Sequence, residues 1–281
     1  MSGFTSLVDL HLHSTASDGK LSPHDLVKLA AEIGLKVIAL TDHDSIDGIM
    51  PALEAAKASP DITFIPGVEI STDLPDGEAH ILGYFIDYSD PDFIRTLEKF
   101  RLSRLNRGKK MVDKLISLGF FIDWKRVQAI AADGVIGRPH IARAMLEKGY
   151  INKFEDAFRY IGHDGPAYVP RDKMTPEEAV ALIIHAKGLP ALAHPFTVKD
   201  PEAMVIKLTR VGLVGLEVYY KDNSPDQTAN TLKLADKYGL IATGGTDYHA
   251  MGEPNEVKMG GVEVPMKAAE QLIALKDKLH R

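Results

Sequence analysis

The sequence predicts an α/β barrel, and three observations lead to that fold class. Short apolar runs of strand length alternate with longer amphipathic stretches that carry helix-capping residues. Side chains that can bind metal follow many of the apolar runs, which is where α/β barrels gather their active groups. The length of 281 residues suits one large domain with an insertion, or two domains.

The first element is a strand, expected over Phe4 to Leu10, that leads into a polar turn. Side chains two positions apart on a strand point to the same side, so His11 and His13 would project together. The turn composition of Ser17-Asp18-Gly19 would bring the Asp18 carboxylate back over them. An isolated pair of this kind usually just closes a strand, so its meaning depends on the rest of the chain.

Helices and strands then alternate. Ser22 and Pro23 have the composition of a helix start, and the periodic run Leu26 to Ile33 ends at Gly34. The next elements are a strand, a helix and two strands joined by the turn Pro75-Asp76-Gly77, expected over Lys36 to Leu40, Met50 to Lys57, Ile62 to Ile65 with a continuation through Pro66-Gly67 to Glu69, and Ala79 to Tyr84.

The alternation of strands and helices stops between Asp90 and Asp172, where helical patterns occur without a convincing strand. They cover Phe93 to Leu118, Trp124 to Ala132, Pro139 to Lys148 and Phe154 to Tyr160. We therefore expect three parts: residues 1–92 as the first part of the barrel, 93–172 as a helical insertion that caps the substrate, and 173–281 as the second part of the barrel.

Positive charge is concentrated in this insertion. Between Arg95 and Arg126 there are ten Lys or Arg and three acids, whereas the whole chain has a net charge of −6. A solvated helix face is the more common reason for such a run. A few of these side chains are expected to face the pocket.

Alternation resumes with a helix that begins after Thr175, whose spacing to Glu178 fits a capping box, and ends at Gly188. A strand then delivers His194. The remaining elements are a strand, a helix, a strand and a final amphipathic helix, expected over Leu213 to Val218, Ser224 to Gly239, Leu240 to Ala242 and Met266 to Leu279.

Composition excludes several kinds of site and of protein. The chain has no cysteine, so any metal must be held by His, Asp and Glu, and a cysteine nucleophile is excluded. The negative net charge argues against coating of nucleic acid by bulk charge. No apolar run is long enough to cross a bilayer and no signal peptide is visible, so we expect a cytoplasmic protein without membrane association. No obligate protein partner is indicated.

Side chains suited to metal binding recur at predicted strand ends and in the loops after them. Six of the eleven histidines and three carboxylates share this placement: His11, His13, His43, His80, His194, His249, Asp18, Glu69 and Asp247. An ordinary polar role is reasonable for any one of them but poor for all together. A catalytic zinc takes about three protein ligands, so nine suit a cluster of two or three divalent ions, with Mn, Fe and Zn all compatible.

These motifs occur in a recognisable order: His-x-His, Ser-Asp-Gly, Thr-Asp-His, Gly-x-Glu, a further His, His-Pro and a late Asp-x-His. In this order they resemble the PHP (polymerase and histidinol phosphatase) family over essentially the whole chain. The resemblance implies a distorted (β/α)7 TIM-like barrel with a trinuclear metal centre at its mouth, acting as a hydrolase on phosphoric ester bonds.

The resemblance also implies which side chains share an ion. A first ion would take His11, His13, Glu69 and Asp247, a second Asp18, His43 and His249, and a third Glu69, His80 and His194. Histidinol phosphatase-like members often have histidine at the place of Asp18, whereas aspartate there is similar to the branch that acts on nucleotides and short RNA. The Gly-Arg-Pro-His motif at 137–140 also resembles that branch.

Arg138 and His140 are the expected contacts to a substrate phosphate. An arginine at a helix start, beside Pro139 at the first helical position, suits both the geometry of a phosphate and the positive end of a helix. A capping turn with an exposed arginine is a nearly equal alternative.

The expected reaction is hydrolysis of an anionic phosphate ester. The leading substrates are nucleoside 3′,5′-bisphosphates or the 5′ end of short RNA, and the alternative is histidinol phosphate or another small phosphomonoester. A metal-bridging hydroxide would attack phosphorus in line. Asp247, His194 and His249 are the candidate catalytic groups beside Arg138 and His140, and His194, His249 or a metal-bound water would protonate the leaving oxygen.

Three further acids have no settled role. Asp42 and Asp44 flank His43 and fit either as partners that orient imidazoles or as exposed loop acids, which is the commoner case. Glu217, in a predicted strand, is equally open.

Two other functional classes remain. An amidohydrolase-type C–N hydrolase also opens with His-x-His, but it usually places a ligating lysine in mid-barrel, and we expect no lysine at a strand end in that context here. A non-catalytic metal-binding PHP module would fold around metal without turnover.

Overall fold

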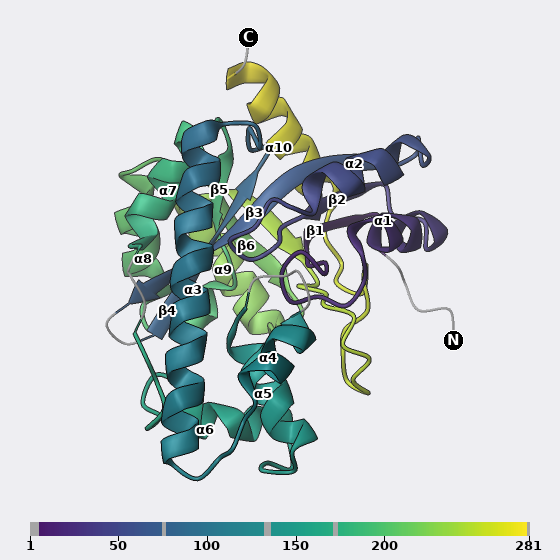
Figure 1. The fold of residues 1–281 in the computed structure, drawn as a ribbon. Coiled ribbons are helices and arrows are strands. Elements are labelled where there is room, and N and C mark those ends of the chain that lie inside the picture. The colour runs from purple at the N-terminus through teal and green to yellow at the C-terminus, as the bar shows by residue number, and fades with distance from the viewer. Residues whose placement is uncertain (1–5, 75–76, 132–135, 171–173, 280–281) are drawn as a thin grey trace.

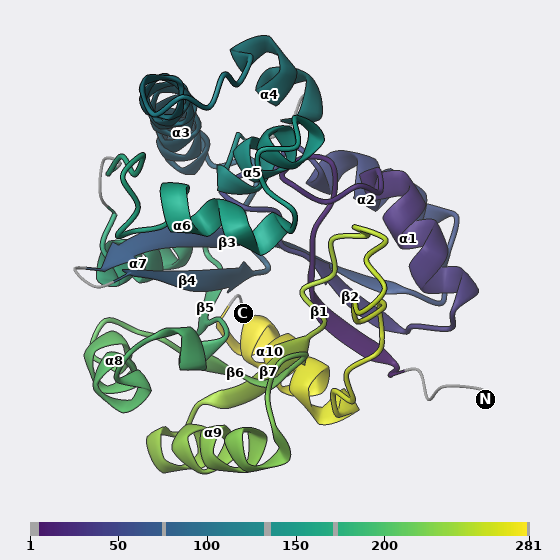
Figure 2. The same cartoon turned by 90° about the horizontal axis from the view of Figure 1, so that it is seen from below.

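The computed structural model describes residues 6–74, 77–131, 136–170 and 174–279. Seven strands form one sheet in sequence order. They are β1 (Val8–Leu12), β2 (Val37–Leu40), β3 (Thr63–Leu74), β4 (Gly77–Tyr84), β5 (Leu189–Leu192), β6 (Gly215–Tyr220) and β7 (Ile241–Gly245). A bridge between Leu12 and Tyr248 joins the two edges, so the sheet nearly closes, as Figure 2 shows. The predicted α/β barrel is confirmed.

One strand departs from the parallel order of the others. The strands β1, β2 and β3 pair in parallel, as do β5, β6 and β7, but β4 runs antiparallel to both β3 and β5. The long strand β3 pairs with β2 through Thr63–Pro66 and then with β4 through Gly67–Leu74. The start of β4 therefore lies at the same end of the barrel as the carboxyl ends of its parallel neighbours.

Helices cover the barrel and extend from one end of it. Those in the described residues are α1 (Pro23–Glu32), α2 (Ile49–Lys57), α3 (Pro91–Ser117), α4 (Trp124–Ala131), α5 (Arg138–Glu147), α6 (Phe158–Ile161), α7 (Pro176–His185), α8 (Pro201–Thr209), α9 (Pro225–Tyr238) and α10 (Met266–Leu279), with short 3₁₀ turns at Phe154–Ala157 and Pro195–Thr197. None of them is both long and apolar enough to cross a membrane.

Capping hydrogen bonds account for the helix starts. The side chains of Ser22, Thr175 and Ser224 each accept a hydrogen bond from the backbone N–H three residues later, and proline follows each cap. These are the starts that the sequence predicts. The overlooked helix α8 has the same kind of signal, because Asp200 caps it and Pro201 follows.

The insertion has a hydrophobic core of its own. Helix α3 begins in the core of the barrel, where Phe93 and Leu97 are buried, and its later residues join a second cluster whose buried residues all lie between Met111 and Ala167. Figure 1 shows α3 beside the barrel, with α4, α5 and α6 near its lower end and α10 at the opposite end. The boundaries at residues 93 and 172 themselves stay a prediction.

Two predicted strands have wrong bounds. The strand β1 runs from Val8 to Leu12, so His11 lies inside it, and Phe4 lies outside the described residues. The strand β3 runs through the Pro66-Gly67 pair, as predicted, but it continues to Leu74 instead of ending at Glu69. In the predicted turn after β3, Pro75 and Asp76 lie outside the described residues.

Candidate active site

The nine predicted metal-binding side chains meet at one mouth of the barrel. His11 comes from β1, His13 and Asp18 from the loop after it, His43 from the loop after β2, Glu69 from β3, His80 from β4, His194 from the segment after β5, and Asp247 and His249 from the segment after β7. The expectation that Glu69 and His80 lie at the carboxyl ends of strands is wrong. Both lie within strands, and the reversed direction of β4 brings His80 to the mouth.

A first group consists of His11, His13, Glu69 and Asp247, each with one ligand atom within 4.8 Å of the others. Nε2 of His13 lies 3.1 Å from Oδ1 of Asp247 and 3.3 Å from Oε2 of Glu69. Nε2 of His11 lies 3.2 Å from the same Glu69 oxygen. These four side chains are the set that the family resemblance assigns to the first ion.

A second group consists of His13, Asp18, His43 and His249. Nε2 of His249 lies 3.2 Å from Oδ1 of Asp18, and Nε2 of His43 lies 3.9 Å from its Oδ2. The rings of His13 and His249 stack, with centroids 4.2 Å apart. The structure thus brings together the three side chains assigned to the second ion and adds His13 to them.

Glu69 lies at the centre of a third group. Its Oε1 is 2.8 Å from Nδ1 of His80 and 3.1 Å from Nε2 of His194, while its Oε2 is 3.0 Å from Nδ1 of His43. The most compact set here is His43, Glu69 and His80, and His194 borders it through Glu69. Two carboxylate oxygens that face different histidines suit a bridging role.

The atoms of this cluster fit a bound cation. Six of its buried atoms have no hydrogen-bond partner: Nε2 of His11, both ring nitrogens of His13, Oδ1 of Asp18, Nδ1 of His43 and Oε2 of Glu69. Buried polar atoms are rarely left unpaired in native proteins. Because these atoms are nitrogens and oxygens gathered around one centre, they match the ligand preference of borderline divalent ions.

The acids and imidazoles of the cluster shift the pKa of one another. Burial raises the pKa of Asp18, Glu69 and Asp247, but the facing histidines outweigh burial and hold each pKa well below its usual range. Burial likewise lowers the pKa of His11, but the carboxylates of Glu217 and Glu69 raise it well above its ordinary value. The carboxylates are therefore ionised, which is the form that binds metal.

Glu217 supports two of these histidines from behind. It is fully buried in β6, its Oε1 lies 2.8 Å from Nδ1 of His11, and its Oε2 accepts the backbone N–H of His194 at 2.7 Å. A carboxylate behind an imidazole fixes the ring orientation and tautomer. Nε2 of His11 is thereby directed at Glu69.

Asp42 and Asp44 are both buried, so their interpretation as exposed loop acids is wrong. Asp42 accepts hydrogen bonds from Ser14 and Ser17, and it therefore holds the loop between His13 and Asp18. Asp44 accepts the backbone N–H of Ser71 and forms an ion pair with Arg104.

Sequence reasoning missed Asp9, which ties the first strand to the last. Its carboxylate accepts hydrogen bonds from the N–H and hydroxyl of Thr246, at 2.9 and 2.7 Å, and from the N–H of Gly260 at 2.9 Å. The segment that carries Asp247 is thereby fixed to β1. An acid in an otherwise apolar strand was the available signal.

Lys221 corrects another expectation. It directly follows β6 and so stands at a strand end, which sequence reasoning overlooked, although its contacts are to Asp247. Its Nζ donates to Oδ2 and to the backbone carbonyl of Asp247, both at 3.0 Å, and the hydroxyl of Tyr220 donates to the same Oδ2 at 3.0 Å. These contacts leave Oδ1 of Asp247 directed at His13.

Backbone conformations that non-glycine residues rarely adopt occur at the same mouth. The φ angles of Asp44, His194 and Asp247 are 48°, 26° and 48°. Non-glycine residues with positive φ are strained, and such residues cluster at active sites. The hydrogen bonds of Lys221 to Asp247 help to hold one of them.

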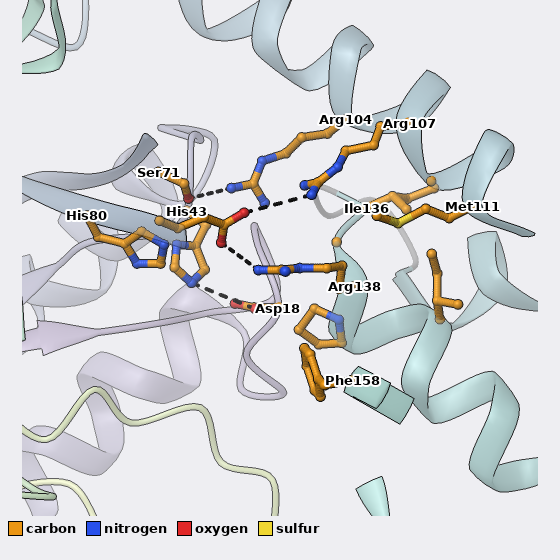
Figure 3. A pocket seen from close by; sticks show the side chains of 15 residues that line it. Asp18, His43, Ser71, His80, Arg104, Arg107, Met111, Ile136, Arg138 and Phe158 are labelled. Carbon is orange, nitrogen blue, oxygen red and sulfur yellow. Dashed lines mark hydrogen bonds and ion pairs between the residues drawn. The ribbon is translucent and has the colours of Figure 1, made fainter. Parts of the chain in front are cut away.

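A first cavity, of about 190 Å³, opens beside the cluster. Figure 3 shows Asp18, His43 and His80 on one side of it and Arg104, Arg107 and Arg138 on the other. Glu78 stands between two of the arginines, because its carboxylate lies 2.5 Å from Nη2 of Arg138 and 3.8 Å from Nη2 of Arg107.

The basic run of the insertion is largely a solvated surface. Eight of its ten cationic side chains are exposed, and Arg104 and Arg107 are the two that are not. Both line the first cavity. The prediction that a few of these side chains face the pocket is confirmed.

A second cavity, of about 430 Å³, lies beyond Pro139 and also borders Asp18. His140 lines this cavity, whereas Arg138 lines the first, so the two predicted phosphate contacts face different spaces. The N–H of Gly137 donates to Nδ1 of His140 at 2.9 Å, and burial lowers the pKa of this histidine.

Comparison with known proteins places the chain in a family. A model of the PHP domain matches residues 9–189. The 3′,5′-nucleoside bisphosphate phosphatase of Chromobacterium violaceum is 33% identical over 260 residues, which cover 88% of each chain. The 5′-3′ exoribonuclease Rnm of Escherichia coli is 32% identical over 88% of this chain and 86% of its own length.

The solved structures agree. A crystal structure of a protein assigned as a metal-dependent phosphoesterase, from Bifidobacterium adolescentis, covers 97% of both chains with a TM-score of 0.86 and 29% identity. The matched domain contains the strands that supply His11, Glu69 and His80. The chain therefore belongs to the PHP family of metal-dependent phosphoesterases.

Proposed function

We propose that this chain hydrolyses phosphate esters of nucleotides, either nucleoside 3′,5′-bisphosphates or the 5′ end of short RNA. The proposal depends on one observation above all, the position of an arginine-lined cavity directly beside the buried cluster of histidines and carboxylates. The nine side chains of the cluster would hold two or three divalent ions: His11, His13, Asp18, His43, Glu69, His80, His194, Asp247 and His249.

Bound divalent ions would supply a water of lowered pKa and would draw off the charge that develops on the phosphoryl group. The donor set accepts Mn, Fe or Zn, and metal availability decides among them. The chain itself fixes the ligands: Glu217 orients His11, and Tyr220 and Lys221 orient Asp247.

The leaving oxygen needs a proton, and His194 and His249 are the candidate side chains for supplying it. Burial lowers the pKa of His194, but its hydrogen bond to Glu69 and the negative charge of Glu69 raise the pKa above its ordinary value. His194 and His249 flank the cluster from two sides. His194, His249 or a metal-bound water would give a proton to the departing alcohol.

The arginines favour a substrate with more than one phosphate. The guanidinium group matches phosphate geometry in a forked arrangement and stays charged when buried. If the reacting phosphate lies at the cluster, Arg107 and Arg138 are placed to bind a neighbouring phosphate in the same cavity. This arrangement supports bisphosphates and oligonucleotide ends over histidinol phosphate.

Two further observations support this substrate class. Asp18 lies in the cluster and lines both cavities. An aspartate at this position resembles the family branch that acts on nucleotides and short RNA. The curated relatives with 32–33% identity carry names that specify a nucleoside bisphosphate and RNA.

A substrate screen tests the proposal. Protein purified without chelators and supplied with Mn²⁺ is given sugar phosphates, histidinol phosphate, nucleoside 3′,5′-bisphosphates and 5′-phosphorylated oligonucleotides, and released phosphate and nucleotide are both measured. We expect the nucleotide substrates to have the highest kcat/KM. Turnover of sugar phosphates or histidinol phosphate alone would contradict the nucleotide assignment.

A matched pair of variants tests the role of the cluster. His13→Ala should abolish turnover, whereas His24→Ala should not change it, because His24 lies on the exposed face of α1. Metal-dependent folding without turnover of any phosphate ester would instead identify a non-catalytic metal-binding module.

A further inference from the structure

The second cavity has a composition unlike that of the first. Its walls include Ile130 and Ala131 of α4, Pro139 of α5, Phe154, and Met251 from the segment after β7. Three elements of the insertion and two segments of the barrel, the loop after β1 with Gly19 and Lys20 and the segment after β7, thus build one largely apolar space. Pockets of several hundred Å³ with apolar walls and a few polar groups are the usual sites of small organic ligands.

The charged groups around this cavity occur in both signs. Lys20 donates to the backbone carbonyl of Met251 at 3.4 Å, and Nη1 of Arg143 lies 4.0 Å from Oε1 of Glu253. Glu155 also lines the cavity. In the first cavity, by contrast, three arginines line the walls beside two acids, Asp18 and Glu78. An anionic group is therefore drawn to the first cavity, and an uncharged organic group fits the second.

Each cavity has one phenylalanine in its lining, and the two rings lie close together. Phe154 lines the second cavity and Phe158 lines the first, with ring centroids 6.0 Å apart. The guanidinium of Arg138 lies over the Phe158 ring, at 5.8 Å. Figure 3 shows the side chain of Arg138 extending toward Asp18, with Phe158 below it. A ligand that reaches both cavities would pass by Asp18.

We infer that the second cavity binds the nucleobase of the substrate, with Phe154 as the stacking surface, while the phosphates lie at the metal-binding cluster and the arginines. This inference rests on the proposed function and adds the place and the chemistry of base recognition. A base buries its flat faces against aromatic and aliphatic groups without regard to its identity. His140 also lines this cavity and adds a polar contact. Its Nδ1 accepts a hydrogen bond from the N–H of Gly137, so the neutral ring carries its proton on Nε2, which can donate to the base.

The experiment compares two substrates that differ only in the base. One is adenosine 3′,5′-bisphosphate, and the other is the abasic analogue in which hydrogen replaces adenine. In the wild-type protein we expect KM to be about tenfold or more lower for the base-bearing substrate. Phe154→Ala should remove most of that difference by raising KM for the base-bearing substrate alone, with kcat on the abasic analogue unchanged.

Two further variants control for folding. Phe154→Leu keeps an apolar side chain of similar size but lacks the aromatic face, so it should fold and still lose most of the preference for the base. Phe121→Ala removes an aromatic side chain that is 67% exposed in the same insertion and should change neither KM. Thermal unfolding of each variant identifies any that is not folded.

The outcomes separate the inference from the proposed function. If folded Phe154→Leu and Phe154→Ala keep the full preference for the base, or raise both KM values equally, the second cavity does not bind the base. If the wild type hydrolyses a chromogenic phosphate ester but neither bisphosphate, the nucleotide assignment itself fails, and the inference fails with it.

Discussion

The two cavities that border Asp18 share the wall around Pro139 but differ in the kind of group that they accept. Arg104, Arg107 and Arg138 surround the first, whereas apolar side chains such as Phe154 form much of the second. A nucleotide has the same two halves, one anionic and one flat and apolar. The difference between the cavities therefore indicates how one enzyme can select for both halves around a single reactive centre.

The largest expected effect comes from the centre that both cavities share. Asp247→Asn removes a negative charge from the cluster and should lower kcat/KM by about 10³-fold or more. The loss should be the same for adenosine 3′,5′-bisphosphate and for its abasic analogue, because the variant acts on neither cavity separately.

Steady-state kinetics and elemental analysis of bound Mn measure this effect. The matched control is Asp226→Asn, an exposed acid in the first turn of α9, which should leave both quantities unchanged. Retention of activity within tenfold in Asp247→Asn would exclude Asp247 from the reactive centre.

The next effect belongs to the first cavity alone. Arg138→Ala should raise KM for the bisphosphate by about 10- to 100-fold, because a charge-assisted contact to the second phosphate is lost. KM for a nucleoside monophosphate with the reacting phosphate only should change much less. Arg95→Ala, on the exposed face of α3, is the control. Equal increases for both substrates would show that Arg138 does not recognise the second phosphate.

Chelation should lower the unfolding temperature by several degrees, because ions that bind only the folded state stabilise it. The drop should be larger at pH 9 than at pH 6. The pKa of His11 is raised in the fold, so in the metal-free protein its protonation stabilises the fold below the ordinary pKa of 6.5, and this contribution is lost as pH rises through the folded pKa.

Calorimetric scans with and without chelator at the two pH values measure this drop. An unfolding temperature that chelation does not change at either pH would mean that the folded cluster binds no ion. A larger drop at pH 6 would contradict the sign derived for His11.

Much of the site could be predicted from sequence because the types and spacing of its side chains indicate metal binding by themselves. His11, His13 and Asp247 stand in compact motifs that only a few structural contexts explain. His80 was found as a ligand candidate even though its placement at a strand end was wrong, since the reversal of β4 still brings it to the mouth. The remaining gaps have physical reasons.

The contacts that sequence reasoning missed connect residues far apart in the chain. Asp9 reaches Thr246 and Gly260, and Lys221 reaches Asp247, and no local pattern marks these partners. The second cavity is missed for the same reason, because Ile130 and Met251 look like ordinary apolar residues until the fold brings them together. Charge and metal-binding chemistry are visible in a sequence, but shape is not.

The smallest effect concerns the carboxylate between the arginines. Glu78→Gln removes a negative charge beside Arg107 and Arg138 and should lower KM for the bisphosphate by about three- to tenfold. The ratio of KM between the bisphosphate and its abasic analogue should change little. Kinetics with Glu54→Gln, an exposed acid on α2, provide the comparison. A rise in KM would mean that Glu78 instead holds the arginines in place.

The most direct test of the central claim is anomalous diffraction at the manganese edge from crystals grown with Mn²⁺. The account predicts two or three manganese peaks among the nine side chains. One should lie at Glu69, and one should lie beside Asp18, which borders both cavities. A fully ordered cluster without any peak, or manganese bound only elsewhere on the protein, would contradict it.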